Sequence, residues 1–132
     1  MNNAPSTVGT FQFSAILDKG KLLQWVFNYT DDRNYELFQM DDNFFYRSQV
    51  RDGKKTEEAK VQFKTDKKKS RTFQISVTSS RIVHQIQQGN GWAALDSWNA
   101  ASGNSGKFGF YLPNNDEVKV SNFSHYSDLK VR

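Results

Sequence analysis

The sequence predicts an all-β protein, built as a two-sheet antiparallel β-sandwich. Apolar and polar residues alternate with a period of two in many short segments, turn residues separate these segments, and 14% of the 132 residues are aromatic. Helical periodicity extends nowhere beyond two turns. About ten strands in a chain of this length need two packed sheets or a closed barrel, because one open sheet would leave a broad apolar face in water.

The predicted strands follow one another from Thr10 onward. Residues 1–9 are small and polar, and we expect a disordered lead-in to a single domain over residues 10–132. The strand-like segments are separated by short runs rich in Asp, Asn, Gly and Lys. They occupy residues 10–17, 22–29, 35–40, 44–50, 59–65, 72–80, 81–88, 92–98, 106–112 and 117–123.

The alternation also predicts which residues face the core. In the second segment, Trp25, Phe27 and Tyr29 share one face, and Trp25 is expected in the interior. His84 lies on the apolar side of its segment, which favours a hydrogen-bonded core histidine. Between two segments, Asp52-Gly53 predicts a tight hairpin because glycine tolerates a positive φ angle.

The last two segments, 106–112 and 117–123, are expected to pair as a hairpin that closes the sandwich. Residues 113–116, Pro-Asn-Asn-Asp, form the turn between them. Phe123 breaks the alternation and requires a bulge or the end of pairing. Gly109 points outward, and its missing side chain would let a ligand approach the sheet closely.

These segments resemble the concanavalin A-like jelly-roll modules, close to the laminin-G-like and 3-keto-disaccharide hydrolase-type domains. The resemblance rests on residues 34–53, 73–82 and 106–123, covers about 115 residues, and implies a jelly-roll fold. A strand with G-x-x-G-F before a segment ending in V-x-x-x-N-F is matched here by Gly106, Gly109, Phe110, Val118, Asn122 and Phe123. These are packing and turn motifs, so they indicate a fold rather than an activity.

Composition excludes several classes of function. The chain has no cysteine, which removes disulfides and thiolate metal sites. No apolar run has the length of a membrane span, so membrane insertion is not expected. The net charge is +4, and the basic residues include two runs, Lys54-Lys55 and Lys67-Lys68-Lys69. We interpret both runs as hairpin connections whose lysines keep the protein soluble. Binding of a heparin-like or nucleic-acid polyanion is the alternative for these lysines. Stacking aromatics are not interleaved with them, so nucleic acid is not an expected partner.

No catalytic constellation is visible. The adjacent acidic pairs, such as Asp31-Asp32 and Asp41-Asp42, lie in or beside predicted turns, where turn chemistry explains them. A calcium site built from these aspartates is an alternative, although no known calcium-loop spacing is present. His125 has no ligand partner at metal-binding spacing. No cofactor or metal is therefore expected, and the protein is predicted not to be an enzyme.

Aromatic and polar residues together form the candidate ligand site. Sugars pack their C–H groups on aromatic faces, and their hydroxyl groups pair with amide or guanidinium groups. Trp92, Asp96 and Trp98 lie along one segment and are expected on one side of it. The alternative for these tryptophans is that one or both of them seal the core of the sandwich. The candidate ligand-binding residues are Trp92, Trp98, Tyr111, Arg47, Gln85, Asn99 and Tyr35.

The functional prediction is a non-catalytic binding module of a larger bacterial protein, with carbohydrate as the ligand and an extracytoplasmic location. One alternative is a protein-interaction or spacer module, in which another protein or domain is the partner. A fragment related to a glycoside hydrolase is the third. Binding of a glycan panel, capture of a specific protein, or turnover of an activated glycoside would distinguish them.

Overall fold

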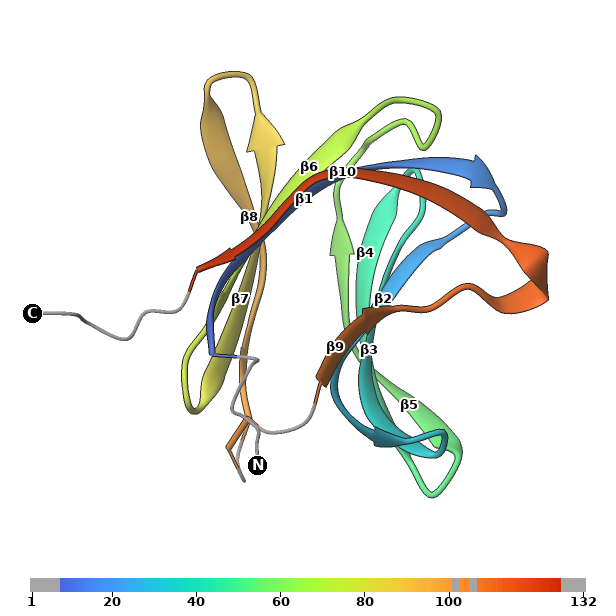
Figure 1. The fold of residues 1–132 in the computed structure, drawn as a ribbon, viewed down its shortest axis with the longest axis vertical. Helices are drawn as coiled ribbons and strands as arrows, with labels where there is room; N and C mark the ends of the chain where they lie inside the picture. Colours follow the sequence, from blue (N-terminus) through green and yellow to red (C-terminus); the bar gives the residue numbers. More distant parts are fainter. Residues whose placement is uncertain (1–7, 101–102, 105–106, 127–132) are drawn as a thin grey trace, which may run out of the picture.

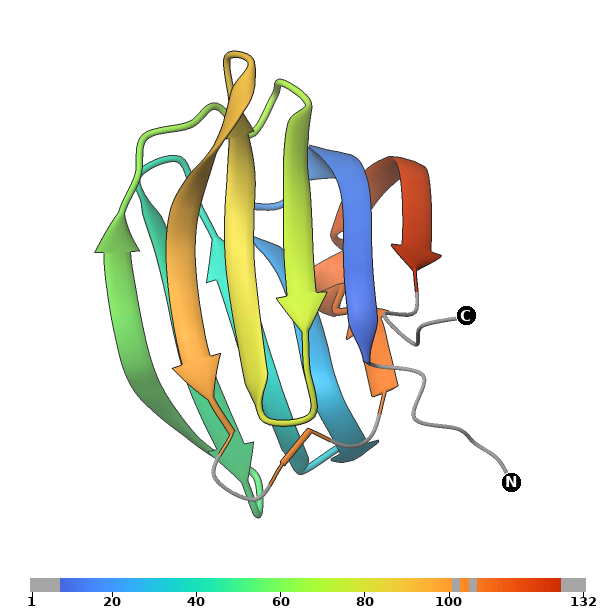
Figure 2. The same ribbon diagram turned by 90° about the vertical axis from the view of Figure 1, so that its left-hand side faces the viewer.

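The computed structural model of the chain describes residues 8–100, 103–104 and 107–126. Their strands form two antiparallel five-stranded sheets that pack face to face (Figure 1 and Figure 2), which confirms the predicted sandwich. Sheet A has the strand order β10-β1-β6-β7-β8, and sheet B has the order β5-β4-β3-β2-β9. The strands are β1 Gly9–Lys19, β2 Leu23–Asp31, β3 Asn34–Met40, β4 Phe44–Arg51, β5 Lys54–Gln62, β6 Arg71–Val77, β7 Arg81–Gln88, β8 Gly91–Asn99, β9 Lys107–Phe110 and β10 Glu117–Tyr126, with a short 3₁₀ helix, η1, at Pro113–Asn115.

The core between the sheets is rich in phenylalanine. Phe13 and Phe73 from sheet A meet Phe27, Phe38 and Phe45 from sheet B, and all five side chains are fully buried. Burying one such side chain contributes about 1.5–3 kcal/mol. The period-two alternation places these residues on the inner faces because successive side chains of a strand point to opposite sides.

One hydrogen bond crosses the centre of this core. The Nε1–H group of Trp25 in β2 donates to Nε2 of His84 in β7 at 2.9 Å, and both side chains are fully buried. The predictions for these two residues are therefore confirmed. Burial, assisted by the positive charge of Arg47, lowers the pKa of His84 to about 3. His84 is thus neutral, and its proton lies on Nδ1 because Nε2 accepts the indole N–H.

The turn between β4 and β5 is the predicted tight hairpin. Asp52 and Gly53 have φ angles of 53° and 82°, the left-handed conformation that the type I′ two-residue hairpin loop requires at both central positions. Lys54-Lys55 therefore lies at a hairpin, as predicted. The segment around Lys67 is different, because it connects β5 of sheet B to β6 of sheet A and crosses between the sheets.

The predicted final hairpin is wrong. β9 pairs with β2 in sheet B, whereas β10 pairs with β1 in sheet A, so the two strands close opposite sheets. The reason is the connection at η1, where Asn114 and Asn115 both have positive φ angles and redirect the chain from one sheet to the other. Asn and Asp tolerate this conformation better than other residues with a β-carbon.

The irregularity predicted at Phe123 is present as a bulge. The pairing of β10 with β1 shifts register between Ser124 and Ser121, and Asn122 has a φ angle of 54°. The ring of Phe123 lies near those of Phe13 and Phe108 but is 48% exposed at this margin of the core. β1 already begins at Gly9, the last residue of the predicted lead-in, and residues 1–7 of that lead-in lie outside the described residues.

Because folded His84 is neutral, the free energy of unfolding should decrease as the solution becomes more acidic. In the unfolded chain His84 has a pKa of 6.5, whereas in the folded chain its pKa is about 3. Between these two values the unfolded chain binds a proton at His84 and the folded chain does not. The free energy of unfolding should therefore fall by up to about 1.4 kcal/mol per pH unit in this window from this group. Urea unfolding of the wild type and of His84→Gln between pH 4 and 7.5 measures it. The difference in stability should narrow as the pH falls; parallel profiles would contradict the assignment.

Candidate ligand-binding site

The seven residues that the sequence singles out lie in three separate places. Tyr35 and Tyr111 lie together on the outer face of sheet B, with ring centroids 6.4 Å apart. The other five residues lie on the outer face of sheet A or between the sheets. The seven residues therefore do not form one surface. Gln85, Trp92 and Asn99 lie on the outside of sheet A, and Arg47 and Trp98 lie between the sheets.

A bulge in β8 separates the two tryptophans. The pairing of β7 with β8 skips Leu95 between Asp96 and Ala94, so side chains on the two sides of the bulge differ in orientation. Trp92 is 38% exposed on the outside, whereas Trp98 pairs with the fully buried Ile82 and packs against the core. The expectation that Trp92, Asp96 and Trp98 share one side is therefore wrong.

Arg47 is occupied by an internal ion cluster. Its Nε–H donates to Asp96 at 2.9 Å and its Nη1–H to Glu58 at 3.0 Å, while the carboxylate of Glu36 lies 4.0 Å away. The guanidinium carbon also lies 5.6 Å from the ring centroid of Trp98, a cation–π contact. These contacts join β4 and β5 of sheet B to β8 of sheet A, so Arg47 has a structural role at this side of the sandwich.

Glu36 is the unusual member of this cluster. Its side chain is fully buried, and neither carboxyl oxygen has a hydrogen-bond partner in the described structure. Burial, together with nearby Glu58, raises the pKa of Glu36 to about 9, although Arg47 acts in the opposite direction. Glu36 is therefore a neutral carboxylic acid at pH 7.

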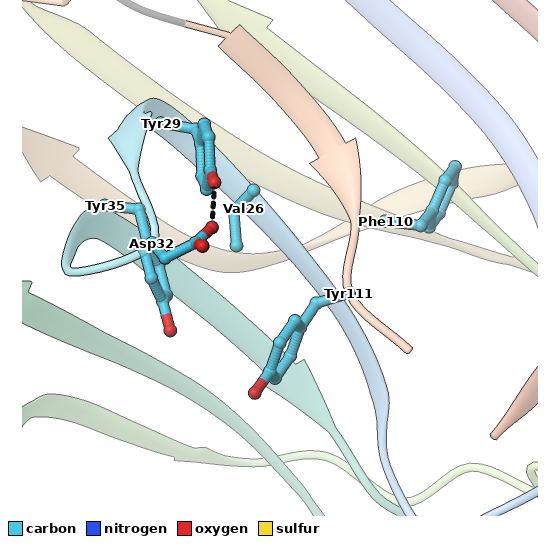
Figure 3. Close-up of a pocket in the computed structure, with 6 residues that line it drawn as sticks. All are labelled: Val26, Tyr29, Asp32, Tyr35, Phe110 and Tyr111. Carbon is cyan, nitrogen blue, oxygen red and sulfur yellow. Dashed lines mark hydrogen bonds between the residues drawn. The ribbon is translucent and has the colours of Figure 1, made fainter. Parts of the chain in front are cut away.

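A cleft lined by tyrosines, which we call the tyrosine cleft, lies on the outer face of sheet B. Figure 3 shows Tyr29, Tyr35 and Tyr111 around the side chain of Val26, while the Phe110 side chain points away from the three rings. The cleft has a volume of about 410 Å³. It is lined by Val26, Tyr29, Asp32, Tyr35, Phe110 and Tyr111.

The three rings form a continuous aromatic wall. The centroids of Tyr29 and Tyr35 are 6.0 Å apart with nearly parallel planes, and Tyr111 continues the row beyond Tyr35. The hydroxyl of Tyr29 donates to Asp32 (Figure 3). This hydrogen bond raises the pKa of Tyr29, and burial raises that of Tyr35. Both phenols therefore stay protonated at neutral pH and keep their hydroxyl groups.

The sheet beside this wall is open to close approach. Val26 pairs with Gly109 of β9, so both positions point outward beside the cleft. A β-carbon added at Gly109 would meet no atom within 4 Å, and the backbone there does not have the left-handed conformation that favours glycine. The space above Gly109 is therefore free, as the sequence predicted.

A second row of side chains, the polar strip, continues along the same face and consists of Gln24, Gln39, Tyr46 and Lys55. Gln39 donates to Gln24 at 2.7 Å and accepts from Lys55 at 3.2 Å. Tyr46 donates to Asp41 at 2.6 Å, which raises the pKa of Tyr46 to about 12. A shallow hollow of about 340 Å³ lies over this strip. Gln24 and Gln39 are only 5% and 7% exposed, so Tyr46 and Lys55 are the more accessible members of the strip.

Sequence reasoning missed Tyr29 as a site residue and expected it on the core side. Asn28 has a φ angle of 55°, and the pairing of β2 with both neighbours loses register at this point. The irregularity turns Tyr29 to the outer face, beside Tyr35. The available signal was Asn28 itself, because asparagine adopts the left-handed conformation more readily than most residues.

The acidic turns behave as turn chemistry predicted. Asp31 accepts from the backbone of Arg33 and the side chain of Asn34, and Asp41 accepts from the backbone of Asn43 and Phe44. Across the described ranges, no three acidic or histidine side chains are grouped to hold a metal ion. His125 packs flat against Phe11, with centroids 4.2 Å apart.

Comparison with known structures identifies the fold. It is similar to that of the carbohydrate-binding module CBM66 from Bacillus subtilis, with a TM-score of 0.70 and 13% identity over 87% of this chain and 72% of that chain. It is also similar to a tetrameric galectin from the ball sponge Cinachyrella sp., with a TM-score of 0.58 and 11% identity over 96% of each chain. The fold is a two-sheet antiparallel β-sandwich of the jelly-roll type.

By sequence, no protein-family model matches the chain, and no curated protein matches it either. At identities of 11–13%, the two structural likenesses establish the fold. Within the part of the chain that is described, no helix has the length and apolar character of a membrane span.

The neutral Glu36 carboxyl group predicts a loss of stability in alkaline solution. Its pKa is raised from 4.5 to about 9, so the folded chain holds a proton that the unfolded chain has released. Between these values, each pH unit should lower the free energy of unfolding by up to about 1.4 kcal/mol. Denaturant unfolding between pH 7 and 9 should show this decline in the wild type and a flatter profile in Glu36→Gln. An equal slope in both proteins would refute the assignment.

Proposed function

We propose that this protein is a non-catalytic carbohydrate-binding module whose binding site is the tyrosine cleft together with the polar strip. The observation that carries the proposal is the row of three tyrosine rings, spaced 6.0 and 6.4 Å apart, beside the open space over Gly109. Such a surface offers aromatic faces and fixed polar groups side by side, which is what recognition of a sugar ring requires.

The chemistry of each part fits a different part of a sugar. The exposed face of Tyr111, which is 40% accessible, suits the C–H groups of a pyranose or furanose ring. Asp32 and the phenolic hydroxyls supply hydrogen-bond acceptors and donors at the end of the cleft. The polar strip lies along the same face, so a chain of two or more sugar units can contact both regions.

Binding without catalysis is part of this proposal. Hydrolysis of a glycosidic bond needs two carboxyl groups placed on either side of it. On this face, Asp32 accepts from Tyr29 and Asp41 accepts from Tyr46 and two backbone N–H groups, so these carboxylates hold local structure. Two proteins of similar fold, a carbohydrate-binding module and a galectin, support the ligand class. An extracytoplasmic location, where most polysaccharides occur, belongs to the same proposal.

Removal of an exposed ring tests the cleft directly. A stacked aromatic ring contributes about 0.5–1.5 kcal/mol beyond its buried area, so Tyr111→Ala should weaken glycan binding roughly two- to tenfold. A glycan array identifies the ligand, and calorimetric titration of wild type and variant measures the affinity. The fold should be unaffected because the ring lies at the surface. Unchanged affinity would exclude Tyr111 from the site.

Filling the space over Gly109 tests the same site without removing a contact. Gly109→Leu should abolish glycan binding and leave the melting temperature nearly unchanged, because the added side chain projects into open space. Trp92→Ala is the matched control, since Trp92 is exposed on sheet A and belongs to the surface that sequence reasoning proposed. Binding that survives Gly109→Leu but is lost in Trp92→Ala would move the site to sheet A.

A further inference from the structure

The tyrosine cleft contains one ionised side chain, the carboxylate of Asp32. The other described residues that line the cleft are aromatic or apolar, and none of them is basic. Figure 3 shows the carboxylate of Asp32 reaching into the space beside the rings of Tyr29 and Tyr35. Asp32 is exposed at the surface, so a ligand in the cleft can reach it. The cleft therefore combines aromatic rings with an accessible negative charge.

One oxygen of this carboxylate remains open to a ligand. The hydroxyl of Tyr29 donates to Oδ1 of Asp32 and holds the side chain in place. Within residues 8–100, 103–104 and 107–126, no group donates a hydrogen bond to the other oxygen, Oδ2. Each oxygen of an ionised carboxylate can accept about two hydrogen bonds. Asp32 therefore keeps the capacity to accept hydrogen bonds from a ligand in the cleft.

The neighbouring cations do not neutralise Asp32. The guanidinium group of Arg33 donates to the backbone oxygen of Asp52 at 2.8 Å, at the β4–β5 turn. Lys107 lies opposite Tyr29 in the pairing of β2 with β9, but it does not line the cleft. In the part of the chain that the structure describes, the ion pairs involve Arg47 and not Asp32. The negative charge of Asp32 is thus uncompensated by an ion pair from the described residues.

The charge of Asp32 acts on the tyrosine rings. Its hydrogen bond raises the pKa of Tyr29, and burial and the charge of Asp32 add to this effect. Burial raises the pKa of Tyr35, and the charges of Tyr111 and Asp32 act in the same direction. A negative charge that disfavours a phenolate also favours a cation at the same place. The face of each ring attracts a cation as well, through its quadrupole.

We infer that the tyrosine cleft selects an amino sugar with a free amine, whose ammonium group lies against the tyrosine rings and donates to Asp32. This inference rests on the proposed function, because it names the class of sugar that the same site binds. Asp32 is then the residue that determines specificity, while the rings supply stacking and cation–π attraction. N-acetylation would remove the charge of the amine, and a uronic acid would bring a second negative charge to Asp32. Both sugars should therefore bind less tightly than the free amine.

The selection has a local origin. The chain carries a net charge of +4, so its overall field attracts anions and repels cations. Charges of both signs line the hollow over the polar strip, where Lys21 and Lys55 lie with Asp41 and Glu57. The described lining of the tyrosine cleft has a charge of one sign only, that of Asp32. The cationic sugar unit is therefore assigned to the cleft rather than to the strip.

Matched oligosaccharides test the selection. The probes are the β-1,4-linked tetramer of glucosamine, its N-acetylated form and the corresponding tetramer of glucose, titrated by calorimetry in mildly acidic solution, where the amine is protonated. The glucosamine tetramer should bind about fivefold or more tightly than either neutral tetramer, through a cation–π contact and an exposed ion pair. The preference should shrink as sodium chloride is added, because salt screens exposed charges. Equal affinities, or a preference that salt does not reduce, would overturn the inference.

One substitution isolates the carboxylate. Asp32→Asn keeps an oxygen that can accept from Tyr29 but removes the charge, and asparagine is well tolerated in turns. It should weaken binding of the glucosamine tetramer about threefold or more and leave binding of the glucose tetramer unchanged. Asp18→Asn is the matched control, since it removes the same charge from an exposed position in β1 of sheet A. Equal losses in the two variants, or equal losses for the two tetramers in Asp32→Asn, would refute the role of Asp32.

A glycan array distinguishes the failure of this inference from the failure of the proposed function. The array presents uncharged, acidic and amine-bearing sugars to the wild type and to the variants. Binding that is lost in Tyr111→Ala but shows no preference for amines would keep the proposed function and refute this inference. Absence of binding to every glycan would refute both. A preference for amine-bearing glycans that is lost in Asp32→Asn and kept in Asp18→Asn would support both.

Discussion

The sandwich depends on the contact between its two sheets, and at the centre of that contact Trp25 donates a hydrogen bond to His84. An indole N–H and an imidazole nitrogen would each be costly to bury unpaired, so each stabilises the other only if the sheets are correctly aligned. The apolar contacts of the surrounding phenylalanine rings depend less on direction than a hydrogen bond does, and they tolerate small shifts of one sheet against the other. The Trp25–His84 bond therefore supplies a directional constraint on how the two sheets are positioned.

Polar groups at the two ends and sides of the sandwich extend this constraint. The cluster around Arg47 joins both sheets at the β5–β8 side, and Arg71 ties the β5–β6 connection to the β3–β4 turn. Both arginines are largely buried, but they differ in one respect. Arg47 has carboxylate partners from both sheets, whereas one edge of Arg71 has none. Both arginines therefore tie together segments that lie far apart in the sequence.

The side chains that stabilise the fold by burial lie mostly on the inner faces of the sheets. The residues of the outer faces can therefore differ without loss of the core. On sheet B, the alternation that sends Trp25 inward sends Gln24 and Val26 outward, where they contribute to the polar strip and the tyrosine cleft. The register shift after Phe27 interrupts this pattern and brings Tyr29 beside Tyr35. Bulges of this kind re-aim side chains without disturbing the core, and this sandwich uses them in β2, β8 and β10.

The sequence by itself determined the fold class, the buried positions of Trp25 and His84, and the tight turn at Asp52-Gly53. These follow from short-range rules, since period-two alternation and left-handed turn residues act within a few positions of the chain. Only the tertiary structure decided that β9 and β10 belong to different sheets and that Tyr29 lies outside. Pairing of distant strands and the register shift of a bulge depend on the partner strand, which a local pattern does not specify.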